Sequence, residues 1–131
     1  MTALWKNWCV VEGFKPVPAT PRNVVRFVKA LAQEMDMDEI WPHVQAISRD
    51  HYTVGLADPT LGGLVAAEIN KISKIQPPRS WGGEAAASFM RLPYDLQLYT
   101  IEREELRNRA LRRAQNEYAE ARKKHAETKA A

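Results

Sequence analysis

The chain has 131 residues, 45% of them hydrophobic and 27% charged, a composition that argues against wholesale disorder. No apolar run approaches the roughly 18 residues of a membrane span, so we expect no membrane partner. Residues 1–101 carry ten Lys or Arg and ten Asp or Glu, so the formal net charge of +3 belongs entirely to residues 102–131.

Two helices are predicted over the first 35 residues. The first covers residues 2–11 and ends at Gly13, because apolar side chains recur there at helical spacing: Leu4, Trp5, Trp8, Cys9 and Val11. The second begins after the cap Thr20, has Pro21 in its first position and ends near Met35. Its predicted buried stripe consists of Val24, Val25, Phe27, Val28, Leu31 and Ala32. Cys9 is the only cysteine, so it forms no intramolecular disulfide, and we expect it to be a small buried side chain.

The third and fourth helices follow two further corners. The third begins at Asp36 or Asp38, and Pro42 must lie in its first turn or kink it. Gly55 ends this helix. The fourth has an apolar pattern made by Leu64, Val65, Ile69, Ile72 and Ile75.

The remaining residues change in character. A segment rich in proline and glycine leads to a short helix over residues 84–91, which Pro93 ends. A long helix rich in Glu, Arg and Ala then runs from about residue 96 to residue 124. No strand pattern is visible, so the sequence predicts an all-α chain. We divide it into a helical bundle (1–76), a linker with a short helix (77–95) and a long basic C-terminal helix (96–131).

The order of motifs between residues 8 and 60 resembles the N-terminal core-binding domain of tyrosine recombinases, the phage-integrase superfamily. The resemblance covers residues 4–75. It rests on Trp8-Cys9 before a glycine, on Pro18-Ala19-Thr20-Pro21, and on Ile40, His43-Val44, Ala46-Ile47, His51, Gly55 and Asp58-Pro59-Thr60. It implies a four-helix, SAM-like bundle that forms half of a clamp around duplex DNA.

The chain also departs from that family. The catalytic Arg, Lys, His and Tyr residues of that family are not found after the region of resemblance. The 55 or so residues after Ile75 are too few for the catalytic fold. Tyr94, Tyr99 and Tyr118 have no catalytic context. We therefore expect a protein that is not an enzyme, with no cofactor or metal site.

Two groups of basic residues are candidate DNA contacts. Arg22, Arg26 and Lys29 share one face of the second helix, and Lys71, Lys74 and Arg79 follow the end of the fourth. The resemblance implies that these two helices face DNA, where each neutralised phosphate releases counterions. On the third helix, Arg49 is a further candidate, because arginine can read guanine edges. Ordinary solvated helix faces are the alternative for all seven residues.

His43 and His51 lie on one side of the third helix but are eight residues apart. This spacing corresponds to about 12 Å along a helix, which is too far for shared metal coordination. We expect both histidines to serve packing and hydrogen bonding between helices.

The long C-terminal helix carries a narrow apolar stripe. Its members are Leu106, Ala110, Ala114, Tyr118 and Ala121, at steps of four, four, four and three. Such a stripe suits contact between helices, including a homodimer. A solvated helix and a basic helix that grasps DNA are the alternatives. Trp81 in the linker is a candidate anchor between this helix and the bundle.

The leading hypothesis is a non-catalytic protein that binds double-stranded DNA, as an accessory or regulatory factor of a mobile element or phage. The neutral charge balance of residues 1–101 favours a rival, a protein-interaction module that keeps the fold without binding DNA. A remnant of a recombinase is a third interpretation. Since no signal peptide is visible, we expect a cytoplasmic protein, associated with the nucleoid if it binds DNA.

Overall fold

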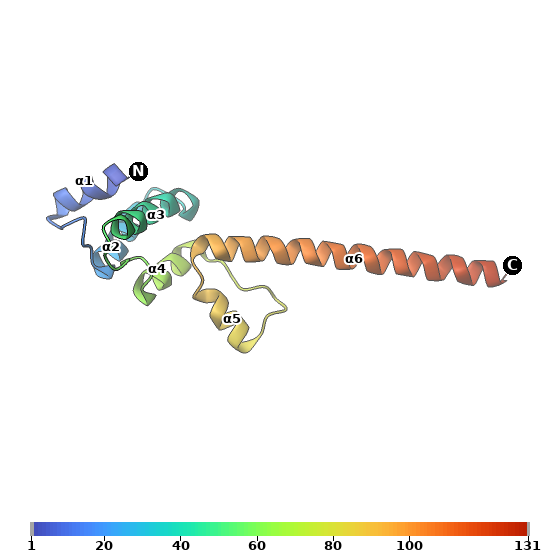
Figure 1. Ribbon diagram of the computed structural model, residues 1–131. Helices are drawn as coiled ribbons and strands as arrows, with labels where there is room; N and C mark the ends of the chain where they lie inside the picture. The colour runs from blue at the N-terminus through green and yellow to red at the C-terminus, as the bar shows by residue number, and fades with distance from the viewer. Residues whose placement is uncertain (1, 131) are drawn as a thin grey trace. The chain divides into compact units, whose positions relative to one another are not determined.

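The computed structural model describes residues 2–130, with side chains from residue 4 onward, and its described residues form helices and loops without strands. The all-α prediction is confirmed. Figure 1 shows the helices in chain order: α1 (Thr2–Glu12), α2 (Pro21–Leu31), α3 (Met37–Thr53), α4 (Gly63–Ser73), α5 (Gly83–Met90) and α6 (Tyr94–Ala130). The chain divides into two compact units, residues 1–97 and residues 98–131.

The first unit uses side-chain caps to begin its helices. The Thr20 hydroxyl oxygen accepts a hydrogen bond from the Asn23 backbone N–H at 3.2 Å, and the Asp36 carboxylate accepts one from Glu39 at 3.0 Å. Each cap satisfies an N–H that has no partner inside its helix. The predicted cap at Thr20 is confirmed, and of the two residues expected at the start of the third helix, Asp36 is the cap.

The observed ends of the helices differ more from the predicted boundaries than the observed starts do. We expected the second helix to reach Met35, but α2 ends at Leu31, whose carbonyl accepts backbone hydrogen bonds from both Glu34 and Met35. This tight turn closes the helix before Asp36 caps the next one. Pro42 is the sixth residue of α3, beyond its first turn, and the helix continues past it to Thr53.

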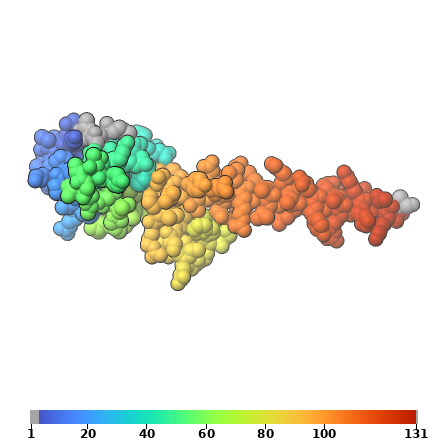
Figure 2. Space-filling view, viewed as in Figure 1, coloured from blue at the N-terminus to red at the C-terminus, as the bar shows by residue number. Residues whose placement is uncertain are grey.

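The core of the first unit is built from aromatic side chains of α1 and α2. The Trp5 and Phe27 rings lie 5.0 Å apart edge to face, and Trp8 lies 5.4 Å from Phe27. The Trp5 indole N–H donates to the Pro16 carbonyl at 3.0 Å, which ties the proline corner to α1. Cys9 is fully buried beside them, as expected, and burial raises the pKa of its thiol. Figure 2 shows the residues of α1 to α4, blue to green, packed closely together.

Two apolar residues that we placed on buried faces are exposed instead. Val11 is 83% exposed because it lies about 120° around α1 from the buried Trp5. Leu64 is 60% exposed, whereas its neighbour Val65 is fully buried. The core side of α4 is therefore narrower than its apolar pattern indicates.

A polar joint holds α4, α5 and the first turn of α6 together inside the first unit. The Gln97 amide nitrogen donates to the Asn70 side-chain oxygen at 2.9 Å and to the Phe89 carbonyl at 3.1 Å. The Asn70 amide nitrogen donates to the Met90 carbonyl at 2.6 Å. Carbonyls at the C-terminal end of α5 are thus satisfied by amide side chains. Trp81 packs edge to face on Phe89, so its contact is with α5.

The second unit is the continuation of α6. This helix is longer than predicted at both ends, since it runs from Tyr94 to Ala130. Every residue from 105 to 130 is exposed. None of the described helices combines the length and the apolar character needed to cross a membrane.

Candidate nucleic-acid interface

The exposed side of α2 presents three cations over a buried apolar side. Arg22, Arg26 and Lys29 are exposed, and Phe27 and Val28 are fully buried in the core. Because the buried side is fixed by packing, the three cations are held toward solvent in a row. The structure therefore brings these predicted residues together on one surface.

Arg26 is the most constrained of these cations. Its guanidinium lies 5.0 Å from the centre of the Phe14 ring and 3.9 Å from the Glu12 carboxylate. Both partners belong to α1 and the corner that follows it. The ion pair is exposed, so water and salt screen it, and it leaves the guanidinium edge accessible.

The α2 cations border α4. Arg22 and Arg26 line a shallow open groove together with Asn23, Val25 and the exposed Leu64 at the start of α4. The two helices pack against each other, and Gly62, just before α4, approaches Pro21 at the start of α2. Leu64 is thus part of a surface that includes the arginines.

The remaining cations of the predicted set follow α4. Lys71 is exposed and lies 4.0 Å from Glu68 one turn earlier, and Lys74 ends the helix with a left-handed backbone (φ 56°). Arg79 is exposed in the segment between α4 and α5. Within the described residues, no ion pair engages Arg22, Lys29 or Lys74.

Charge is segregated within the first unit despite its neutral sum. Residues 13–33 contain four Lys or Arg and no Asp or Glu, and residues 69–83 contain three and none. Four carboxylates lie before α3 and in its first turn, at Glu34, Asp36, Asp38 and Glu39, whereas Glu12 and Glu68, at the edges of the two basic ranges, pair with Arg26 and Lys71. A neutral total therefore conceals two basic stretches, one over α2 and one after α4, a difference that a net-charge count misses.

Arg49 belongs to a different surface. It is exposed on α3 and lines a second groove with Gln45, Trp41 and Leu61, among other residues. No residue of the α2 groove lines this one. The structure thus groups Arg22 and Arg26 and separates Arg49 from them.

His51 is a structural residue. It is fully buried, its Nε2 accepts a hydrogen bond from the Ala19 backbone N–H at 2.8 Å, and its Nδ1 donates to the Ile47 carbonyl at 2.8 Å. This pairing requires the neutral tautomer with the proton on Nδ1. The predicted packing role is confirmed for His51, but the buried Nδ1 of the half-buried His43 has no hydrogen-bond partner.

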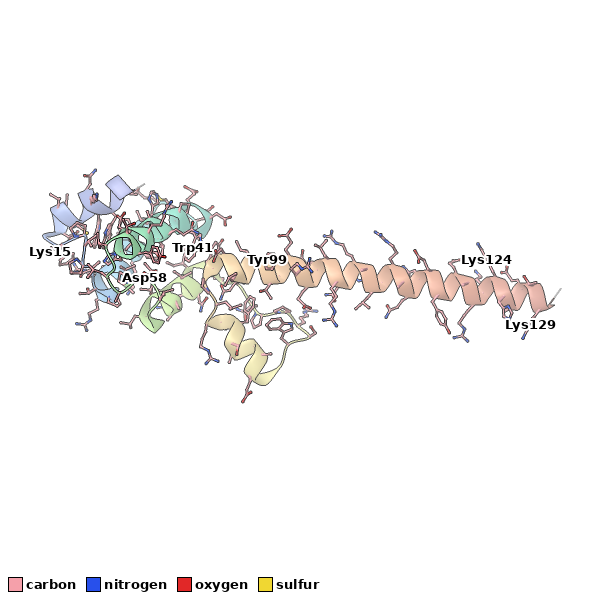
Figure 3. All side chains as sticks on the ribbon, in the orientation of Figure 1. Lys15, Trp41, Asp58, Tyr99, Lys124 and Lys129 are labelled. Carbon is pink, nitrogen blue, oxygen red and sulfur yellow. The ribbon has the colours of Figure 1, made fainter. Side chains whose placement is uncertain are left out.

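Asp58 organises the corner between α3 and α4 (Figure 3). Its carboxylate accepts hydrogen bonds from the Ser48 hydroxyl and from both the backbone N–H and the hydroxyl of Thr60. Burial on its own raises the pKa of Asp58, but these hydrogen bonds favour the charged form more strongly and lower it below 3.8. The Asp58-Pro59-Thr60 motif is thus a structural corner.

Tyr94 is a structural residue that the sequence did not identify. Its hydroxyl donates to the Asp38 carboxylate at 2.6 Å, and its ring lies 5.7 Å from that of Trp41. Burial, followed by the hydrogen bond and negative charge of Asp38, raises the pKa of Tyr94 to about 12. No local signal marks this pairing, because 56 residues separate the two partners.

The described side chains include no group of three or more His, Cys, Asp or Glu arranged to hold a metal ion. The buried His51 and Tyr94 and the half-buried Asp58 instead make the hydrogen bonds given above.

Comparison with known proteins gives one partial likeness. An integrase/recombinase xerD homolog of Selenomonas ruminantium is 27% identical to this chain over 73 residues. The match covers 53% of this chain and 21% of that protein, so the chain spans about a fifth of its relative's length. No family model matches the chain, and no solved structure matches it. The likeness supports a region related to tyrosine recombinases over about half of the chain.

Proposed function

We propose that the chain binds duplex DNA without cutting it, through the basic surface of α2 and the end of α4. The observation that carries this proposal is the segregation of charge. Residues 13–33 and 69–83 hold seven cations and no carboxylates, and α2 packs against α4. Cations placed in this way neutralise phosphates and release condensed counterions, whatever the DNA sequence.

The partial likeness to an integrase/recombinase homolog supports the same role. Such a protein works on DNA as a substrate, and a related helical bundle would hold the duplex for it. We propose accordingly that this chain serves as an accessory or regulatory factor of a mobile element or phage. Arg22, Arg26 and Lys29 make the main phosphate contacts, with Lys71, Lys74 and Arg79 extending the surface. Arg49 forms a separate, weaker contact.

Fluorescence anisotropy with a labelled random-sequence duplex at several salt concentrations tests this proposal. The triple variant Arg22→Gln, Arg26→Gln, Lys29→Gln should bind more weakly. The logarithm of the association constant should decrease less steeply with the logarithm of the salt concentration. The magnitude of this slope should drop by about 2 to 3, since each lost phosphate contact removes about 0.9. Circular dichroism checks that the variant, which also loses the Arg26 contacts with Glu12 and Phe14, remains folded.

A matched control separates the α2 surface from net charge. The variant Arg112→Gln, Lys123→Gln, Lys129→Gln removes the same charge from exposed positions of α6. It should retain the salt slope of the unmodified chain. Equal weakening in both triple variants, or no binding to the duplex at low salt, would contradict the proposal.

One observation favours a second candidate, a protein-interaction module. Val10 and Val11 on α1 are 77% and 83% exposed, and Tyr52 on α3 is 84% exposed. Apolar side chains exposed to this degree can bind a protein partner. A chain that fails to bind DNA while Val11→Ser and Tyr52→Ser abolish binding to a partner would establish this candidate instead.

A further inference from the structure

Residues 105–130 form a long stretch of α6 in which every residue is exposed. Its side-chain contacts include the Arg107–Glu104 ion pair at 3.8 Å and the Arg122 guanidinium 5.8 Å from the Tyr118 ring, both within the same helix. A helix that is polar on most sides needs many such pairs or a partner to remain folded. Because residues 105–130 bury no side chain, packing within the described chain does not stabilise this part of α6, which points to a partner.

The apolar stripe of α6 supplies a surface for that partner. The stripe consists of Leu106, Ala110, Ala114, Tyr118 and Ala121, and over four turns it winds through about 120° of the helix surface, an arc that also contains Glu117. Leu106 and Tyr118 are 49% and 66% exposed. Alanine at the intervening positions allows another helix to approach closely, because its side chain adds little to the distance between the two axes.

Charge along α6 indicates the direction in which a second helix would lie. Carboxylates outnumber cations at residues 102–105, where Glu102, Glu104 and Glu105 surround one arginine, and three consecutive cations follow late in the helix at Arg122, Lys123 and Lys124. Figure 3 labels Tyr99 near the beginning of this helix and Lys124 and Lys129 near its end. A parallel copy would set the late cations against themselves, whereas an antiparallel copy sets them against the early carboxylates.

We infer that α6 binds α6 of a second copy of this chain, antiparallel and centred on Ala114. In this register Tyr118 of each copy packs on Ala110 of the other, so that a large side chain meets a small one. Glu104 and Arg122 flank the stripe on the same side, and Arg122 of one copy lies about 3 Å, or two residues, along the helix from the level of Glu104 of the other. The inference goes beyond the proposed DNA binding and is independent of it, because it is measured without DNA.

Sedimentation equilibrium of the full chain without DNA gives the first test. The expected result is a reversible dimer, and Tyr118→Glu should convert it to a monomer. A monomer at the highest attainable protein concentration would overturn the inference. A dimer that forms only after duplex DNA is added would also overturn it and would assign this helix to DNA binding.

Disulfide trapping distinguishes the two directions. A mixture of Ala110→Cys and Tyr118→Cys chains should form a mixed disulfide, since these positions face each other in the antiparallel pair. Thr128→Cys alone should not cross-link, because the two copies place it at opposite ends. The unmodified chain is the control, since its Cys9 is buried. Cross-linking of Thr128→Cys without the mixed disulfide would show a parallel pair and refute the register.

A charge exchange tests the Glu104–Arg122 contact. Glu104→Arg and Arg122→Glu should each weaken the dimer about tenfold, because each replaces two symmetric attractions with repulsions. The double variant should restore the original dissociation constant. The two positions are 18 residues, or about 27 Å, apart in one helix, so the rescue requires the second copy.

Arg112→Glu is the matched control for this exchange, since it reverses one exposed charge on the side of α6 away from the stripe. It should leave the dimer unchanged. Failure of the double variant to recover, with all variants helical by circular dichroism, would contradict the proposed register.

Discussion

The two units of the chain hold their residues in different ways. In residues 1–97, aromatic rings around Phe27 and buried hydrogen bonds at His51, Gln97 and Tyr94 fix the helices to one another. In residues 98–131, each described side chain from 105 onward is exposed. The helices of the first unit are thus stabilised by tertiary packing, whereas the exposed part of α6 relies on the helix propensity of its residues.

The largest expected effect comes from the core of the first unit. Phe27→Ala should lower the free energy of unfolding by about 3–5 kcal/mol, because it opens a cavity against Trp5 and Trp8. Urea unfolding followed by tryptophan fluorescence measures it, since all four tryptophans are in this unit. Leu106→Ala is the control and should change this value by less than about 0.5 kcal/mol. Equal losses in both variants would mean that the units unfold together.

The two histidines that differ most in burial give the next contrast. His51→Gln should cost about 1–3 kcal/mol, because it disturbs the hydrogen bonds with Ala19 and Ile47 in a buried site. His125→Gln replaces an exposed residue of α6 and should leave the same unfolding curve unchanged. If His51→Gln were neutral, the buried hydrogen bonds would not be a source of stability.

A tyrosine pair adds a dependence on pH. Tyr94→Phe removes the hydrogen bond to Asp38 and should cost about 1 kcal/mol at neutral pH. Because the pKa of Tyr94 is raised from 10.0 to about 12, its contribution is present below pH 10 and is lost as the pH rises toward 12. Unfolding measured across this window should show a shallower alkaline loss in Tyr94→Phe. The exposed Tyr99, changed to Phe, should behave like the unmodified chain.

The smallest effect on the first unit should come from a change in α6 itself. Ala119→Gly lies away from the apolar stripe and should destabilise the helix locally by about 1 kcal/mol. Hydrogen exchange should accelerate around residue 119, while tryptophan-detected unfolding remains unchanged. A shift of the tryptophan curve would show that the second unit is coupled to the first.

The sequence was sufficient to predict six helices, because each has an apolar period, a cap or a flanking proline or glycine. It placed Thr20 and Gly55 correctly at helix boundaries, and it left Asp36 and Asp38 as alternatives for the start that Asp36 caps. The sequence did not predict which polar side chains are buried by contacts with residues far along the chain. Gln97 looks like one more polar residue of a polar helix, yet it is fully buried against Asn70, 27 positions away.

The basic surface could be predicted only in part. Helical spacing was enough to put Arg22, Arg26 and Lys29 on one face. That Arg49 lines another groove, and that Leu64 is exposed beside the arginines, depends on how α3 and α4 pack. Net charge was misleading, because four acidic residues before α3 and in its first turn cancel part of the cations in the sum but belong to another segment of the chain.

Lys74 shows how local geometry and surface charge can conflict. Its left-handed backbone at the end of α4 is a conformation that glycine adopts freely and that costs a residue with a side chain about 1–2 kcal/mol. Lysine nevertheless occupies the position, within the stretch of cations that follows α4. An engineer who replaced it with glycine would gain a more robust helix end and give up one positive charge. Lys74→Gly would therefore stabilise the helix end and remove a cation from the surface that we propose binds DNA.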